Sequence, residues 1–245
     1  MISVCVPNFV PGTPTGTWAS MDDVDTWGFL TQYRDTLSAG LVPSLPTMGL
    51  VFYAPLESDQ STAETGQTIN KYGSVSFSDS SAVFNDSGTL YFDIGSSAST
   101  GTNGVTLSVW FKGETFGYDQ ILFGYGTSPE SSSGESIFLF CSRSALVMSV
   151  TGDLGGSPAV TGNTSVMDNA WHHIAATYDG NTATLYIDGN LNASGTLTLD
   201  IGATTGGIGG AWWRASRYLK GNVKAARIYN RALSAAEIGT LSTEF

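Results

Sequence analysis

From residue 48 onward, the chain alternates short apolar runs with turn-forming residues. The runs are rich in β-branched and aromatic side chains and are bounded by Gly, Ser or Asn, a pattern that indicates strands. The predicted strands are Gly49–Leu56, Gly88–Gly95, Val105–Lys112, Ile121–Phe123 and Ile137–Phe140. Their spacing is typical of an antiparallel β-sandwich.

Residues 171–189 give the clearest local signal. Two alternating segments, Trp171–Tyr178 and Thr184–Gly189, flank an Asp-Gly-Asn sequence at residues 179–181. Glycine accepts the positive φ that such a tight connection requires, so the pattern predicts a β-hairpin. A second Asp-Gly pair at residues 188 and 189 predicts that the chain turns again there.

Residues 1–46 follow a different pattern. Several Pro and Gly residues up to Gly16 indicate an extended arm, Ser20 with Asp23 resembles a capping box, and Gly40 is a helix stop signal. Between these signals, apolar residues recur every three or four positions and therefore share one helical face. They are Met21, Val24, Trp27, Leu30, Tyr33 and Leu37. This arm and amphipathic helix either cover one end of the main domain or anchor the chain to a partner.

The amino-acid composition and net charge exclude several classes of function. The 245 residues include 30 Gly and many Ser and Thr, which suits strands and turns better than long helices. The net charge of -11 leaves no basic surface, so we expect neither nucleic-acid nor membrane binding. No apolar run reaches the roughly 18 residues of a membrane helix, and the first residues lack the features of a Sec signal peptide. Cys5 and Cys141 are expected to be free thiols.

The hairpin and the segments after it resemble a known family. The residues that carry the resemblance are Trp171–Gly180, Leu185–Gly189, Ile201-Gly202, Gly221–Val223, Arg227–Ser234 and Glu237-Ile238. In order and spacing they are similar to a laminin-G-like domain of the concanavalin A-like jelly-roll superfamily. The resemblance covers residues 47–245 and implies an all-β, two-sheet antiparallel jelly-roll sandwich with variable loops at its rim. Such domains mostly recognise glycans or proteins, but the scaffold also hosts hydrolases, so the site must be argued from residues.

The residues give little support for catalysis. A jelly-roll glycosidase needs two carboxylates that face each other, commonly set by alternating acidic residues on one strand, and this sequence has no such pattern. Its acidic residues lie in turns or stand alone, as do Asp179, Asp188, Asp93 and Asp119. Adjacent strand residues point to opposite faces, so His172 and His173 cannot act together. One ring is expected to pack in the sandwich and the other at its surface, and no catalytic residue or enzymatic activity is predicted.

The resemblance also implies a calcium site that this sequence has altered. In many relatives the ligands come from the first loop and from an Asp-Glu pair before the Arg-Ile-Tyr strand. Glu57 and Asp59 remain here, but Thr62 stands where an Asp is common, and Lys224 and Ala225 replace the pair. Calcium prefers six to eight hard oxygen ligands, so we expect the site to be lost and predict no cofactor. We expect Lys224 to form an ion pair with Glu57 in its place.

Two loops concentrate residues suited to ligand binding. The first holds Trp212, Trp213, Arg214, Arg217 and Tyr218, and the second holds Phe116, Tyr118 and Asp119. Aromatic faces complement the C–H faces of sugar rings, and a guanidinium donates to hydroxyls or to an acidic sugar's carboxylate. These loops are therefore candidate glycan-binding residues. The alternatives are a protein interface, or a lid in which Trp212 or Trp213 covers the core.

A domain of extracellular type without an export signal suggests a phage structural protein, because such a protein is made in the bacterial cytoplasm and exposed after lysis. We expect a glycan-binding adhesion module on the virion surface, in a head fibre, decoration or tail protein. Residues 1–46 would attach it to other virion or oligomer subunits. The alternative is a structural or decoration subunit that makes protein contacts only.

Overall fold

The computed structural model describes residues 44–98, 100, 103–113, 116–127, 135–142, 147–151, 160–212 and 216–245. Residues 45–245 form one compact unit. The predicted arm and helix, with the apolar stripe from Met21 to Leu37, lie outside the described residues. None of the described helices is long and apolar enough to cross a membrane.

Strands dominate the described residues. Their bounds are β1 (Leu50–Ala54), β2 (Ile69–Ser78), β3 (Ser81–Asp93), β4 (Val105–Gly113), β5 (Gln120–Gly126), β6 (Ser136–Cys141), β7 (Val147–Thr151), β8 (Val160–Ser165), β9 (His172–Tyr178), β10 (Thr182–Ile187), β11 (Asn190–Thr196), β12 (Thr205–Ile208) and β13 (Lys220–Tyr229). A 3₁₀ turn, η1 (Gly95–Ser97), follows β3, and a helix, α2 (Ala235–Leu241), follows β13.

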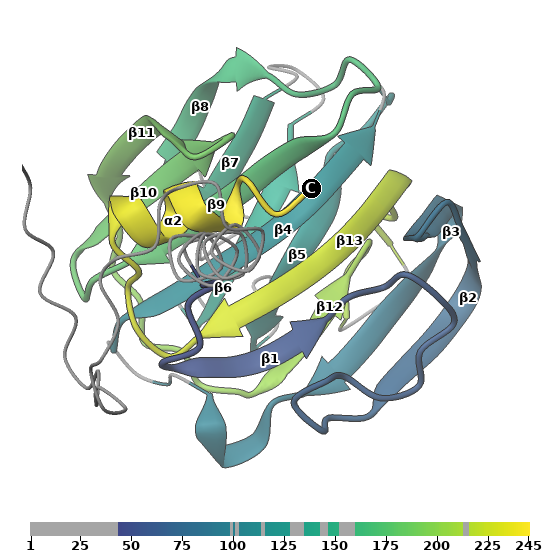
Figure 1. Cartoon of the computed structure of the whole chain (residues 1–245), viewed down its shortest axis with the longest axis horizontal. Coiled ribbons are helices and arrows are strands. Elements are labelled where there is room, and N and C mark those ends of the chain that lie inside the picture. The colour runs from purple at the N-terminus through teal and green to yellow at the C-terminus, as the bar shows by residue number, and fades with distance from the viewer. Residues whose placement is uncertain are drawn as a thin grey trace, which may run out of the picture. The chain divides into compact units, whose positions relative to one another are not determined.

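The strands form one continuous antiparallel sheet that curls over on itself (Figure 1). The first layer contains β11, β10, β9, β4 and β13, with β1 beside β13; the second contains β12, β5, β6, β7 and β8. Strand β3 joins the layers, because residues 82–85 pair with β13 and residues 90–93 pair with β12. This arrangement confirms the predicted jelly-roll sandwich and shows that its two sheets are continuous through β3.

Side-chain hydrogen bonds close the two free edges of the curled sheet. Asn192 of β11 accepts from the N–H of Asn163 in β8 at 2.9 Å and donates to the hydroxyl of Thr164 at 2.6 Å. The exposed N–H and C=O groups of an edge strand otherwise invite pairing with another chain. Asn192 therefore ties the two edge strands to each other.

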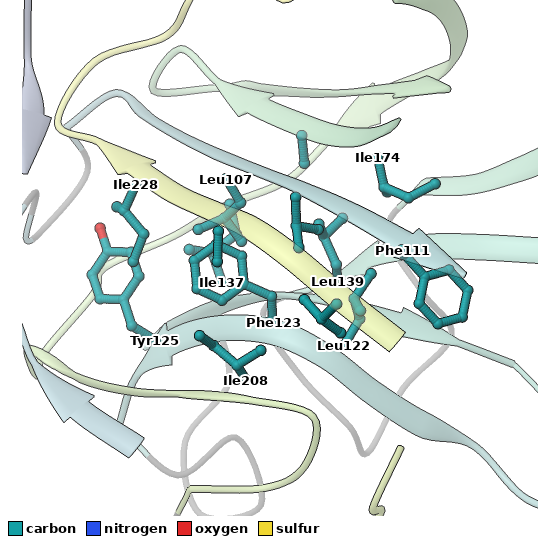
Figure 2. Close-up of a cluster of buried hydrophobic side chains, with 14 of the residues drawn as sticks. Leu107, Phe111, Leu122, Phe123, Tyr125, Ile137, Leu139, Ile174, Ile208 and Ile228 are labelled. Atoms are coloured by element: carbon teal, nitrogen blue, oxygen red, sulfur yellow. The ribbon is translucent and has the colours of Figure 1, made fainter. Parts of the chain in front are cut away.

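The core lies between the two layers. Figure 2 shows Leu107 and Phe111 of β4 facing Phe123, Leu139 and other side chains of the second layer. Phe52 of β1 stacks on Phe92 of β3 with 4.0 Å between ring centroids. Burying one such aromatic side chain stabilises the fold by roughly 1.5–3 kcal/mol. Because apolar residues alternate along these strands, they all lie on one face of each layer, and the two layers pack face to face to bury them.

Helix α2 covers part of the outer face of the first layer, and Figure 1 shows it lying across β9 and β10. The Ser234 hydroxyl accepts from the N–H of Glu237, whose carboxylate in turn accepts from the N–H of Ser234, forming a capping box. Ile238 and Leu241 are buried in a cluster with Tyr229 of β13. The outer face of this layer therefore has its own small apolar core.

Candidate functional site

The two loops predicted to bind ligand converge in the structure. The guanidinium Nη1 of Arg217 lies 3.6 Å from Oδ2 of Asp119, and the backbone N–H of Ile121 donates to the carbonyl of Arg217. The ammonium of Lys220 lies 5.5 Å from the ring centroid of Phe116. Residues 116–119 and 216–220, far apart in the sequence, thus form one site.

Partly exposed aromatic rings come from both loops and from β2. Phe116 and Tyr118 pack edge to face, with 4.7 Å between their centroids. The hydroxyl of Tyr218 is hydrogen-bonded to that of Tyr72 in β2; burial, together with this contact, raises the pKa of Tyr218. Tyr72 is 53% exposed. We call the surface formed by Phe116, Tyr118, Asp119, Arg217, Tyr218 and Tyr72 the aromatic surface.

Trp212 has a different environment. Its indole N–H donates to the carbonyl of Gly126 at 2.9 Å, and its ring packs edge to face on Phe138, on the outer side of the second layer. A Cβ on Gly207 would lie 3.0 Å from the Trp212 Cβ, so glycine gives this loop its close approach. Trp212 thus covers the outer Phe138 cluster and not the core between the layers, and ligand contact by Trp212 stays a prediction. Trp213 and Arg214 lie outside the described residues.

A polar pocket of about 140 Å³ adjoins the aromatic surface. Its lining residues are Val83, Phe84, Asn85, Lys112, Gly113, Asn169, Lys220, Gly221 and Asn222. A Cβ on Gly113 would lie 2.2 Å from the Phe111 ring, and a Cβ on Gly221 would lie 3.1 Å from it. The absence of a side chain at both positions lets this ring pack beneath the pocket. Lys220 belongs to both features, since it lines the pocket and lies over Phe116.

The histidine pair lies on opposite faces of β9, as predicted, but the buried ring is not inside the sandwich. His173 is fully buried on the outer face of the first layer, where its Nε2 lies 2.9 Å from the Ser108 hydroxyl and its ring contacts Trp110. Burial, reinforced by the charge of Arg227, lowers its pKa to about 4. The expectation of a ring packed between the sheets was wrong, because the register of β9 turns Ile174 inward instead. The buried Ser108–His173 pair has no access for a substrate.

His172 stabilises the hairpin. Its Nδ1 lies 2.8 Å from Asp188 and its Nε2 lies 3.1 Å from Asp168. Burial lowers the pKa of this ring, but the bonds to the two carboxylates outweigh that effect and the pKa is raised. Asp188 also accepts the backbone N–H of His173 at 2.8 Å. These bonds fix the second predicted turn, where Asp188 has φ 50°.

Lys224 does not form the expected ion pair with Glu57. Its ammonium lies 3.7 Å from the ring centroid of Phe245, 4.6 Å from that of Trp171 and 5.8 Å from that of Trp110. The prediction was wrong because the aromatic rings attract the ammonium through cation–π contacts. Burial lowers the pKa of Lys224, whereas Glu244 and Glu57 act on it in the opposite direction.

The residues at the family's calcium position do not fit calcium. Asp59 accepts a hydrogen bond from the ammonium of Lys71 at 2.8 Å. Ala225 has no carboxylate, and its backbone N–H donates to the carbonyl of Pro55. Lys224 adds a positive charge to the same region. Within the described ranges, no group of three or more His, Cys, Asp or Glu side chains is placed to hold a metal ion.

Comparison with known proteins now identifies the family. A model described as the concanavalin A-like lectin/glucanases superfamily matches residues 86–239, well over half of the chain. The chain belongs to this superfamily. No curated protein matches the sequence.

Solved structures share this superfamily fold. Domain 4 of AbnA, an extracellular arabinanase of Geobacillus stearothermophilus in complex with arabinotriose, has a TM-score of 0.56 at 18% identity and covers 80% of this chain and 100% of its own. Botulinum neurotoxin type C, whose cell entry is described as dependent upon interaction with two ganglioside molecules, has a TM-score of 0.62 at 9% identity and covers 80% of this chain and 51% of its own. Trypanosoma rangeli sialidase has a TM-score of 0.64 at 18% identity, covering 89% and 37%. The chain thus spans about half of the neurotoxin chain and less of the sialidase.

Sequence reasoning missed several residues of this candidate site. Tyr72 joins the aromatic surface, and five polar residues line the pocket: Asn85, Lys112, Asn169, Lys220 and Asn222. They come from β2, β3, β4, β13 and the loop before β9, so no local motif marks them together. Only the antiparallel register between β3, β4 and β13 brings most of them together.

Proposed function

We propose that this protein is a non-enzymatic glycan-binding module that recognises sugars through the aromatic surface. The observation that carries the proposal is the convergence of the two loops, in which the Arg217–Asp119 pair joins the loop of Tyr218 to the loop that holds the rings of Phe116 and Tyr118. The superfamily supports it, as do the arabinotriose complex of the arabinanase domain and the ganglioside dependence of the neurotoxin.

The chemistry of the surface suits a sugar. Ring faces such as that of Tyr118 pack on sugar C–H groups, while Arg217 and Asp119 offer donors and acceptors to hydroxyls. A hydrogen bond to a charged group contributes about 1.5–3 kcal/mol. In a shallow site, bonds from sugar hydroxyls to the ion pair would therefore supply a large share of the binding free energy. Several copies on one particle would multiply weak single contacts through avidity.

Two of the described acidic side chains have environments that do not suit a glycosidase acid. Asp93 accepts from the Thr204 hydroxyl and from the N–H of Gly95, and Asp179 accepts from the N–H groups of Thr182 and Asn181. These bonds lower the pKa of both carboxyls. A glycosidase acid needs a raised pKa, so neither residue suits that role.

A glycan array probed with the full chain tests the proposal. Tyr118→Ala and Arg217→Met should each weaken retention of the bound glycan by about tenfold, because each removes one direct contact. Leu191→Ser, which alters an exposed apolar residue in β11, is the matched control and should bind like the wild type. Melting curves establish that all variants fold. A blank array with folded protein, or equal binding by all variants, contradicts the proposal.

The double variant Trp212→Ala, Trp213→Ala distinguishes the roles of the tryptophan loop. Loss of glycan retention at unchanged melting temperature supports ligand contact. A lower melting temperature with retained binding supports the lid, because the Phe138 cluster would lose its cover. Impaired assembly with intact binding supports a protein interface.

We further propose that the module is displayed on a virion surface and anchored through residues 1–46. Its support comes from the acidic, Gly-rich composition and from the apolar stripe predicted for residues 21–37. Deleting residues 1–46 should release the chain from its particle or oligomer, as measured by co-sedimentation. Assembly that survives the deletion counts against this anchor. A structural subunit that makes protein contacts only is the alternative, and a blank glycan array favours it.

A further inference from the structure

We infer that the polar pocket beside the aromatic surface binds the carboxylate or sulfate group of an acidic glycan. The inference rests on the proposed function and names the class of sugar that the site takes. The charges, the hydrogen-bond donors and the location of the pocket support it.

The two lysines of the pocket differ from most other described cations. Four other described cations have a carboxylate within 4 Å: Lys71 with Asp59, Arg217 with Asp119, Arg227 with Glu244 and Arg231 with Glu237. No described carboxylate lies within that distance of the ammonium of Lys112 or Lys220. On a chain with a net charge of -11, two positive charges without such a partner at one pocket are a local excess that an anion can neutralise.

The sheet register points these groups at the same place. Lys112 of β4 is the cross-strand neighbour of Asn222 in β13, and Lys220 of β13 is the neighbour of Asn85 in β3. Side chains alternate along a strand, and the flanking residues Phe111 and Val223 are buried in the core. The lysines and asparagines therefore share the outer face of the first layer.

The donors of the pocket match an oxyanion. An ammonium has three N–H donors and an asparagine amide has two, and bonds from charged donors to oxyanions are the strong ones. Asn222 is held in place because its amide donates to the Ser81 hydroxyl at 3.0 Å. Asn169 is held by its backbone N–H, which donates to the carbonyl of Gly113 at 2.9 Å. The Asn222 amide, already held by Ser81, therefore loses little entropy when an anion binds.

Among the residues that the structure describes, no acidic side chain lines the pocket. Asp86 follows Asn85 and Asp168 precedes Asn169 in the sequence, but neither lines the pocket. Asp168 is bound to His172 instead. The volume of about 140 Å³ is several times the roughly 30 Å³ of a water molecule, enough for a carboxylate or sulfate group. Because Lys220 also contacts Phe116, a sugar on the aromatic surface has its charged substituent within reach of the pocket.

An NMR titration of the full chain tests the pocket directly. The probes are D-glucuronate, glucose 6-sulfate and, as the uncharged control, the methyl ester of glucuronate. We expect the charged sugars to shift the backbone amides of Gly113, Asn169, Gly221 and Asn222, and the ester to leave them unchanged. Added salt should weaken the binding, because it screens the lysine charges. A stronger response to glucuronate identifies a carboxylate as the ligand group, and a stronger response to the sulfate ester identifies a sulfate.

Lysine variants identify the groups responsible. Lys112→Met and Lys220→Met keep most of the side-chain volume and should each raise the dissociation constant about tenfold, by removing one charged donor. Asn85→Asp keeps the shape of the side chain and adds a negative charge, so it should weaken binding as well. Lys71→Met removes a lysine that is already paired with Asp59 and should leave the titration unchanged.

The outcomes separate the two proposals. Equal shifts with the ester and the acid, no shifts at tens of millimolar, or unchanged binding by both lysine variants overturns the anionic pocket. A glycan array that shows only neutral ligands overturns it while leaving the proposed function intact. Shifts at the pocket amides together with a blank array overturn glycan recognition by the aromatic surface, but support the preference of the pocket for an anion.

Discussion

Two adjacent histidines show how position in a strand decides the chemistry of a residue. His173 is buried beside Ser108 and its pKa is lowered to about 4, whereas His172 lies between two carboxylates and its pKa is raised. The sequence predicts that the two rings face opposite ways, because side chains alternate in a strand. Which ring is buried, and under what, depends on the segment that packs on that face.

This difference predicts a specific pH dependence of stability. The unfolded chain protonates His173 near its ordinary pKa of 6.5, whereas the folded chain resists protonation until about pH 4. The free energy of unfolding should therefore fall by up to about 1.4 kcal/mol per unit as pH drops between these values. Denaturant titrations at several pH values should show a shallower fall for His173→Gln.

His172 is the control for this prediction, because its contribution to stability depends on pH in the opposite direction. Because the folded pKa of His172 is raised, its contribution is fully present at low pH and is lost as pH rises through that pKa. His172→Gln should therefore cost most stability at acidic pH. If stability falls with pH equally in the wild type and in His173→Gln, this pH dependence does not come from His173.

At the scale of elements, the segment after α2 holds the outer face of the first layer together. Arg227 of β13 is 2% exposed, and its guanidinium donates two hydrogen bonds to the carboxylate of Glu244, at 2.7 and 2.5 Å. Its guanidinium also lies 4.1 Å from the ring centroid of Tyr53. Phe245 then packs edge to face on Trp110. A short polar segment thus neutralises a buried charge.

We expect Glu244→Gln to destabilise the protein by about 3 kcal/mol, because it leaves the guanidinium of Arg227 buried without an anion. Thermal or chemical unfolding measures the loss. Asp59→Asn, which breaks the exposed pair with Lys71, is the matched control and should cost no more than about 1 kcal/mol. Equal effects of the two substitutions would show that Arg227 does not depend on Glu244.

Strands are predicted best from the sequence when the residues on at least one face of the strand are all apolar. Strand β9 and hairpin β9–β10 match the predicted segments closely. Strand β2 was not predicted, because most of its residues are exposed and only Ile69 and Val75 are buried. Strand β3 extends well before the predicted Gly88, through a bulged stretch where Asp86 has φ 61°. Both elements depend on pairing with neighbours rather than on their own pattern.

At the scale of the whole molecule, the altered calcium position predicts independence from the metal. Lys224 and the Lys71–Asp59 pair make the first loop and β13 unsuitable for a divalent cation. We expect millimolar calcium to leave the melting temperature unchanged and a chelator to leave it unchanged as well. A rise with calcium that the chelator reverses would show that other ligands form a site.

The sequence alone determined the all-β class, the hairpin and its turns, and the superfamily, and it marked two aromatic loops as candidates for sugar binding. These features are local, because alternation, Asp-Gly turns and clustered aromatic residues lie within a few positions of one another. The tertiary structure decided that the loops meet, that Trp212 packs on Phe138, and that Lys112 and Lys220 share a pocket. Those contacts join residues up to about a hundred positions apart, and only the curl and register of the sheet bring them together.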